Sequence, residues 1–109
     1  MAARDPEALV VLVTTPTADK AAEIARTLVE EKLAACGNVL PAVRSIYRWE
    51  GKLCDDSEAL LVLKVPAKRF PELRDRVAAI HPYELPEVIA LPVVDGLERY
   101  VSWIVQSMY

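Results

Sequence analysis

His81 is the side chain best suited to metal chemistry in this sequence, because imidazole binds copper and zinc well and the chain has only one histidine. A Cu(I) site usually takes two or three imidazole or thiolate ligands, so copies of the chain would have to converge to complete one. The other interpretation is structural. His81 stands directly before Pro82, where a helix must end, and a histidine at a helix end can interact with the terminal carbonyl groups. His81 is therefore a candidate metal ligand with a structural alternative.

The remaining metal-binding side chains predict no dedicated site. Cys36 and Cys54, the only cysteines, lie in separate segments and lack the spacing of a Cys-x-x-Cys pair. Their apolar neighbours favour reduced, structural thiols. The acids Asp55, Asp56 and Glu58 could offer oxygens to a divalent ion, but their spacing matches no known loop, and a solvated turn flank is the expected use. We predict no firm cofactor, at most a weakly bound divalent cation such as copper.

Two aromatic residues are the other candidates for binding. Tyr47 and Trp49 are two positions apart, so on a strand they share one face. They could stack on a ligand, but packing between subunits is the favoured use. An enzyme is not predicted, because the chain has no Ser-His-Asp set, no glycine-rich phosphate loop and no HExxH motif.

Composition sets limits on the partners. The 109 residues fit one domain, 1–109, with 53% hydrophobic and 27% charged side chains, and residues 1–7 are expected to form a flexible N-terminal extension. The net charge of −3 and the lack of a basic run argue against nucleic acid. The longest apolar run, residues 8–13, is far too short for a membrane helix, and the acidic start is unlike a signal peptide. A cytoplasmic location is expected.

The elements that must position these side chains follow from hydrophobic periodicity and proline punctuation. Residues 8–15 form a continuous β-branched run typical of a buried strand. Apolar residues at steps of three and four predict helices over residues 17–35, ended by Gly37 and Asn38, and over residues 70–80. The other predicted elements are a bent strand over 39–49, a turn at 50–52, strands over 58–65 and 88–94, and a short helix after Gly96.

This order predicts an α+β, ferredoxin-like (split βαβ) fold, with an antiparallel sheet, both main helices on one face and an added C-terminal helix. Alternate residues of strand 58–65 are apolar on both sides, so a monomer would leave one apolar face open to water. A partner subunit is expected to cover it.

Five segments of the chain carry a specific pattern. They are EKLAACGNV (31–39), SIYRWEGK (45–52), EALLVLK (58–64), HPYELPE (81–87) and YVSWI (100–104). Together and in this order they resemble the CutA divalent-cation tolerance family. The resemblance spans residues 9–104, nearly the whole chain, and implies a homotrimer whose long hairpins extend the neighbouring sheets. It also implies a role in copper and divalent-cation tolerance, with signalling suggested by likeness to PII trimers.

Within these segments, polar residues in apolar surroundings require partners if buried. We expect them, together with Tyr47 and Trp49, to line a cleft between subunits. A PII-like sensor that binds an effector in this cleft is the alternative to a role in metal tolerance. The four polar residues are Glu58, Lys64, Tyr83 and Glu87.

The chain departs from the family pattern at several positions. Gly37 stands where valine is usual, Val65 where threonine is usual and Leu97 where asparagine is common, and the first is expected to weaken local packing. The copper ligands ascribed to some members fall on Val13, Ile80 and His81, so only His81 of the three could bind metal.

Overall fold

The computed structural model describes residues 5–107, and no helix within that range is long and apolar enough to cross a membrane. Part of the predicted extension over residues 1–7 lies outside the described residues. Glu7 is held in place by its carbonyl, which accepts a hydrogen bond from the Ala67 amide at 2.9 Å. The elements are β1 (Ala8–Thr15), α1 (Ala18–Glu30), β2 (Cys36–Trp49), β3 (Lys52–Pro66), the 3-10 turn η1 (Ala67–Arg69), α2 (Phe70–Ile80), β4 (Ile89–Pro92) and α3 (Glu98–Gln106).

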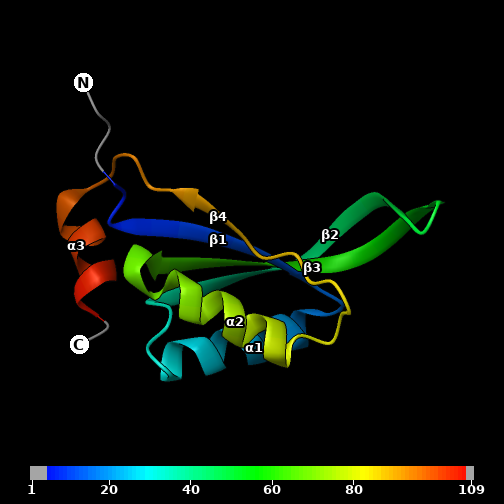
Figure 1. Ribbon diagram of the computed structural model, residues 1–109, viewed down its shortest axis with the longest axis horizontal. Coiled ribbons are helices and arrows are strands. Elements are labelled where there is room, and N and C mark those ends of the chain that lie inside the picture. The colour runs from blue at the N-terminus through cyan, green and yellow to red at the C-terminus, as the bar shows by residue number, and fades with distance from the viewer. Residues whose placement is uncertain (1–4, 108–109) are drawn as a thin grey trace.

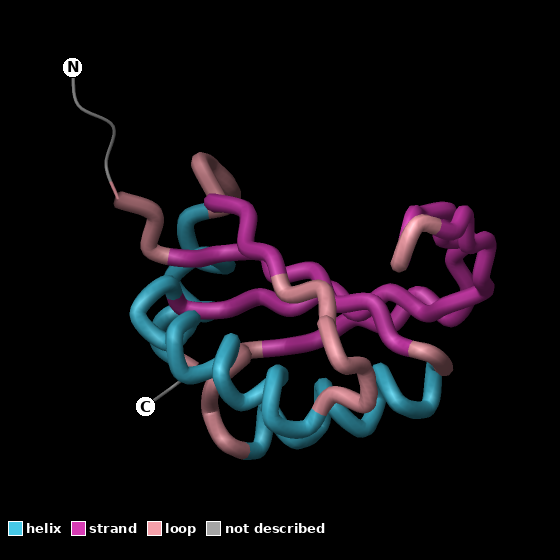
Figure 2. The backbone as a smooth tube through the Cα atoms, turned by 45° about the vertical axis from the view of Figure 1, so that its right-hand side comes forward, coloured by secondary structure: helices cyan, strands magenta, loops and turns pink. Residues whose placement is uncertain are grey.

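The four strands form one antiparallel sheet in the order β2-β3-β1-β4. Helices α1 and α2 lie side by side on one face of the sheet, and α3 lies at the end away from the hairpin tip (Figures 1 and 2). Two strand-helix-strand units that share one sheet in this order make the split βαβ arrangement. The predicted ferredoxin-like α+β fold is confirmed.

The core lies between the sheet and these two helices. Odd-numbered residues of β1 and β3 face the helices, and Val11, Val13, Leu61 and Leu63 are fully buried there. Even-numbered residues face the other way, where Leu12 pairs with Val62 across the two strands and Leu60 lies further along; all three are only half-buried. The second apolar face predicted from the sequence is thus present and open.

Strands β2 and β3 form a hairpin whose distal half extends beyond the helices as an arm (Figure 1). The pairing register shifts between Leu40 and Val43, around Pro41, which has no amide hydrogen for the ladder. This shift corresponds to the bend predicted at the proline. At the tip, Glu50 (φ 49°) and Gly51 (φ 76°) both have positive φ, as two-residue hairpin turns require.

The predicted start of β3 at Glu58 was wrong, because the strand already begins at Lys52. Asp55 and Asp56 therefore lie in a paired strand and not beside a turn. Arg44 on β2 explains how an acidic segment can pair: its guanidinium donates two hydrogen bonds to the Asp55 carboxylate, at 2.8 and 2.7 Å. This ion pair also lowers the pKa of Asp55.

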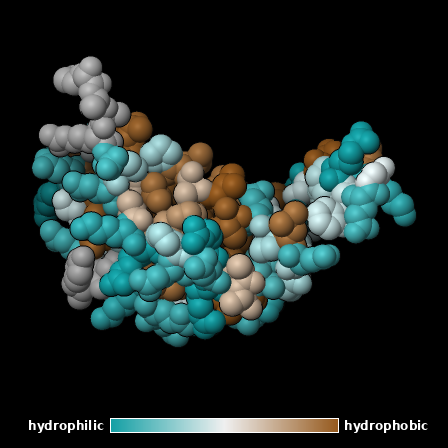
Figure 3. Space-filling view, viewed as in Figure 1, coloured by the Kyte–Doolittle hydropathy of each residue, from teal (hydrophilic) through white to brown (hydrophobic). Residues whose placement is uncertain are grey.

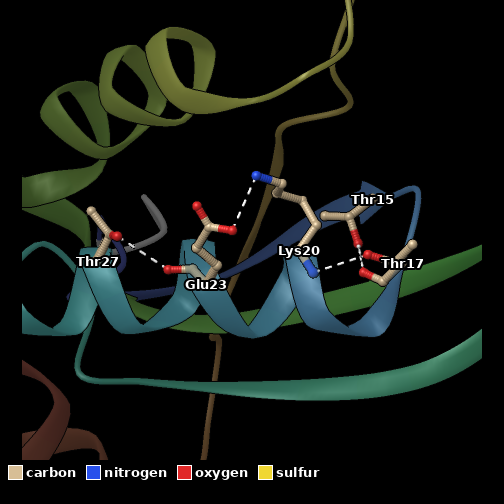
Figure 4. Close-up of polar contacts among 5 residues, drawn as sticks. All are labelled: Thr15, Thr17, Lys20, Glu23 and Thr27. Carbon is tan, nitrogen blue, oxygen red and sulfur yellow. Dashed lines mark hydrogen bonds and ion pairs between the residues drawn. The ribbon is translucent and has the colours of Figure 1, made fainter.

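Helix α1 begins as its sequence suggests. The Thr17 hydroxyl accepts a hydrogen bond from the Lys20 amide at 3.0 Å, which satisfies one free amide at the helix start. The Thr15 hydroxyl donates to the Thr17 carbonyl at 2.8 Å, and Lys20 pairs with Glu23 one turn on (Figure 4). The cap thus joins the end of β1 to the helix start and fixes the direction in which the chain turns.

The predicted end of this helix near Ala35, at Gly37 and Asn38, was wrong. The helix ends at Glu30, and Lys32 takes a positive φ of 60°, so that the Leu33 and Ala34 amides both donate to the Leu28 carbonyl. A lysine is an unusual residue at such a position, and the sequence therefore gave no stop signal there. Gly37 instead belongs to β2, where an added Cβ would lie 3.0 Å from the Ala25 Cβ, so the glycine allows close approach of helix and sheet and leaves no void.

Candidate functional site

A cavity of about 670 Å³ lies between the hairpin arm and the segment that follows α2. In Figure 1 that segment, drawn in yellow, passes beside the base of the arm. Five of the six side chains predicted to share a cleft line this cavity: Tyr47, Trp49, Glu58, Tyr83 and Glu87. A single chain therefore brings these residues together before any partner is added.

The sixth residue, Lys64, lies elsewhere. Its ammonium group donates a hydrogen bond to the Asn38 side-chain oxygen on the neighbouring strand β2. Both residues lie on the open face of the sheet, because their neighbour Leu63 points toward the helices. Lys64 thus has a polar partner on β2, but it does not line the cavity that the other five predicted residues share, although Glu58 on the same strand does.

Glu58 and Tyr83 form the polar centre of the cavity. Glu58 is the first buried residue of β3, with 9% of its surface exposed, and its Oε2 accepts a hydrogen bond of 2.6 Å from the Tyr83 hydroxyl. Burial, followed by the hydrogen bond and charge of Glu58, raises the pKa of Tyr83 above its usual value. This bond links the base of the hairpin to the segment after α2.

Tyr47 makes a similar contact on the arm itself. Its hydroxyl donates to the Asp56 carboxylate on the paired strand. The hydrogen bond, together with burial and the negative charge of Asp56, raises the pKa of Tyr47 to about 12. Both tyrosine rings are therefore held at the hydroxyl end by carboxylates that accept but cannot donate.

His81 lies beside the cavity and is almost fully buried, with 8% exposed. The Tyr83 amide donates to its Nδ1 at 3.1 Å, so the proton of the neutral ring is on Nε2, which donates to the Thr14 carbonyl at 2.8 Å. The alternative use predicted for the ring, contact with the terminal carbonyls of its own helix, was wrong. The ring connects the end of β1 to the turn after α2, and a metal bond at Nδ1 would displace the Tyr83 amide.

Six further residues line the cavity and were not singled out from the sequence. Pro82, Glu84 and Leu85 belong to the segment HPYELPE, so their position next to Tyr83 and Glu87 was a usable signal. Ser45 and Ile46 precede Tyr47 on the hairpin. Thr14, at the end of β1, had no such signal, because only the fold brings that strand end to the hairpin.

The two cysteines are not bonded to each other. Cys36 Sγ lies 3.8 Å from the Tyr100 hydroxyl of α3, and Cys54 Sγ lies 3.9 Å from the Lys52 carbonyl. Among residues 5–107 no three His, Cys, Asp or Glu side chains form a group that could hold a metal ion. Copper binding at Cys36 or Cys54 would therefore need further ligands from another chain or from solution.

The raised tyrosine pKa values give a test of the site. Tyrosinate absorbance should lag well behind free tyrosine as the pH rises above about 10. Because the folded-state pKa of Tyr47 and Tyr83 is raised, these bonds stabilise the fold below about pH 10, and that contribution is lost as the pH rises through the raised values. In a Glu58→Gln variant, part of the absorbance should return toward the normal tyrosine range. An unchanged titration in that variant would contradict the Glu58–Tyr83 contact.

Together, the fold and the cavity define a small α+β protein of the ferredoxin-like class with a ligand-sized acidic and aromatic cavity at its hairpin. The model of the CutA1 divalent ion tolerance protein family matches residues 9–107, and the chain belongs to this family. The family is named for tolerance of ions and not for a reaction.

Curated relatives agree over most of the chain. The divalent-cation tolerance protein CutA of Thermus thermophilus is 48% identical over 95 residues, which cover 87% of this chain and 92% of that protein. Human protein CutA is 49% identical over 94 residues, 86% of this chain and 52% of its own length. The chloroplastic CutA of Arabidopsis thaliana is 43% identical over 91% of this chain and 54% of its own length. The chain thus spans about half the length of the latter two.

Solved structures give the same result for the fold. The Thermus thermophilus protein Cut A1 superposes with a TM-score of 0.89 at 46% identity, covering 92% of this chain and 97% of that one. A CutA of Archaeoglobus fulgidus, named periplasmic, gives 0.89 at 34% identity, covering 94% of this chain and 99% of that one. Because relatives are named for the chloroplast and the periplasm, the cytoplasmic location of this chain stays a prediction.

Proposed function

We propose that the protein is a homotrimeric binding and signalling protein that acts in tolerance of divalent cations, copper among them. The observation that carries this proposal is the family match over residues 9–107, together with relatives named for divalent-cation tolerance. The trimer, the copper and the signalling role come from the resemblance. The features that follow support them in this chain.

The trimer is supported by apolar surface that one chain leaves uncovered. On the arm, Ile46 and Leu53 expose 64% and 77% of their surface, and Trp49 also remains exposed. Hydrophobic residues also gather over β4 and the neighbouring sheet in Figure 3, where Ile89 and Leu91 are exposed. Large contiguous apolar surfaces usually mark a contact between subunits. A closed ring of three chains would cover both the arm and the open face of the sheet.

Metal binding in this proposal uses His81 as the candidate ligand. His81 already satisfies both ring nitrogens with backbone groups. A metal ion must replace one of these hydrogen bonds, so the proposed affinity for copper or another divalent cation is weak. Neighbouring chains would have to supply the remaining ligands.

The test is a titration of the purified protein with Cu(II) and Zn(II) at neutral pH, beside His81→Ala and a Cys36→Ser/Cys54→Ser variant. We expect weak binding that is mostly lost in His81→Ala and kept in the cysteine variant, because imidazole is the strongest nitrogen ligand of each chain. Thermal unfolding without metal should also show a loss of roughly 1 to 3 kcal/mol in His81→Ala, because two partly buried backbone groups lose their partner. Tight binding that survives in His81→Ala but fails in the cysteine variant would contradict this assignment.

A PII-like sensor is the second candidate, and the cavity is the observation that favours it. A ligand site of about 670 Å³ is within the usual range for small molecules, and in the proposed trimer it would lie beside a neighbouring chain. Nucleotide binding is less well supported, because the chain has no glycine-rich phosphate loop.

A further inference from the structure

We propose that the cavity between the arm and the segment after α2 binds a small organic cation, meaning a compact molecule that carries a protonated amine or a quaternary ammonium group. The inference rests on the sensor candidate above and names its class of ligand. It is carried by three features of the cavity: aromatic walls, an uncompensated negative charge and carboxylates that do not converge on one point.

The aromatic walls come from both sides of the cavity. Tyr47 and Trp49 stand on the arm, and Tyr83 stands on the segment after α2. The two tyrosine hydroxyls are bound to the Asp56 and Glu58 carboxylates, which fix the direction of each ring. Electron-rich ring faces attract ammonium groups, most strongly where water is excluded.

The charge of the lining is entirely negative. Glu58, Glu84 and Glu87 line the cavity, and no lysine, arginine or histidine is among the described lining residues. Glu58 is nine-tenths buried, and Tyr83 occupies only its Oε2. Its Oε1 accepts no hydrogen bond from residues 5–107 and therefore reaches solvent on the cavity side, because no fully buried side-chain oxygen or nitrogen in that range lacks a partner. A largely buried carboxylate with a free oxygen favours a cationic ligand.

The arrangement does not suit an inorganic ion. A divalent metal ion needs several ligand atoms within about 2 to 2.6 Å, and residues 5–107 contain no cluster of three His, Cys, Asp or Glu that could supply them. The acids instead border a space of about 670 Å³, far larger than a bare ion. An anionic ligand such as a nucleotide would be repelled by the three carboxylates, and the described lining has no lysine, arginine or histidine to pair with it. An organic cation can contact the aromatic side chains and neutralise the negative charge at the same time.

The experiment follows Trp49 fluorescence in a Trp103→Phe background, where Trp49 is the only indole. The probe is choline, and its uncharged isostere 3,3-dimethylbutan-1-ol is the matched control, with sodium chloride keeping the ionic strength equal. We expect saturable quenching or enhancement with choline and binding weaker by roughly tenfold or more for the isostere, because the isostere lacks the charge. Equal responses to the two compounds, or a choline response no larger than that of sodium chloride, would overturn the proposal.

Two variants locate the site. Glu58→Gln keeps the shape and an acceptor for Tyr83 but removes the buried charge, so choline should bind roughly tenfold more weakly. Glu72→Gln removes an exposed carboxylate of α2 that pairs with Arg69, outside the cavity, and should leave the choline affinity unchanged. Choline binding that is equal in both variants would place the ligand elsewhere and overturn the assignment. Unfolding midpoints of both variants show whether a loss comes from misfolding.

The same samples separate this inference from the leading proposal of a trimer that acts in metal tolerance. Light scattering reports the assembly and copper titration reports metal binding, independently of choline. Trimers that bind copper but not choline would overturn the organic-cation inference and leave the metal-tolerance proposal standing. Charge-dependent choline binding by a protein that is monomeric and binds no copper would support the inference and contradict the proposed trimer and metal role.

Discussion

Replacing Trp49 with aspartate should convert the proposed trimer to smaller species and lower the thermal stability at the same time. Trp49 stands at the end of β2, next to the tip of the arm, and keeps 41% of its surface exposed in one chain. Burial of an aromatic side chain against a neighbour contributes on the order of a few kcal/mol, and an unpaired carboxylate in such a contact adds a desolvation cost. Light scattering at micromolar concentration and thermal unfolding measure the two effects.

The matched control is Trp103→Asp. Trp103 lies on α3 and contacts Tyr100 of its own chain, with ring centroids 5.5 Å apart. We expect its replacement to affect assembly less than that of Trp49, because its partner is intramolecular. A wild-type protein that is monomeric, or a Trp49→Asp protein that is still trimeric and equally stable, would show that the arm does not hold the assembly together.

The fold was predictable because its signals are periodic. The β-branched run of residues 8–15 coincides with β1, and the apolar spacing of residues 70–80 coincides with α2. The boundaries that failed depend on tertiary contacts. Helix α1 ends before Lys32, which has a positive φ, and a lysine is not a residue type that predicts this conformation. Strand β3 includes Asp55, whose charge is paired with that of Arg44 on the opposite strand, a contact that only the folded hairpin creates.

The candidate site was predictable in membership but not in geometry. Five of the six predicted cleft residues share one cavity. They lie on only two segments, the hairpin and the segment after α2, and the fold brings these two segments together. The partners of His81 were not predictable. The Thr14 carbonyl becomes accessible to the ring only because β1 ends beside the turn that follows α2, and a contact 67 positions apart in sequence leaves no local pattern.

Two leucines on opposite faces of β3 separate the stability of one chain from that of the assembly. Leu63 faces the helices and is fully buried, whereas Leu60 faces the open side, opposite Leu40 and Thr14, and is only half-buried. Leu63→Ala should lower the free energy of unfolding by about 2 to 5 kcal/mol, because it removes buried methyl groups and leaves a cavity in the core.

Leu60→Ala should leave the fold of each chain nearly intact and weaken self-association instead, because in the proposed trimer a partner covers the surface that this substitution removes. Denaturant unfolding at high protein concentration, followed by light scattering on dilution, distinguishes the two variants. Leu63→Ala should unfold at lower denaturant while its folded fraction keeps the wild-type mass, and Leu60→Ala should lose mass on dilution before it unfolds. If Leu60→Ala kept the wild-type mass at every dilution, the open face of the sheet would not be a subunit contact, and the arm alone would have to hold the trimer.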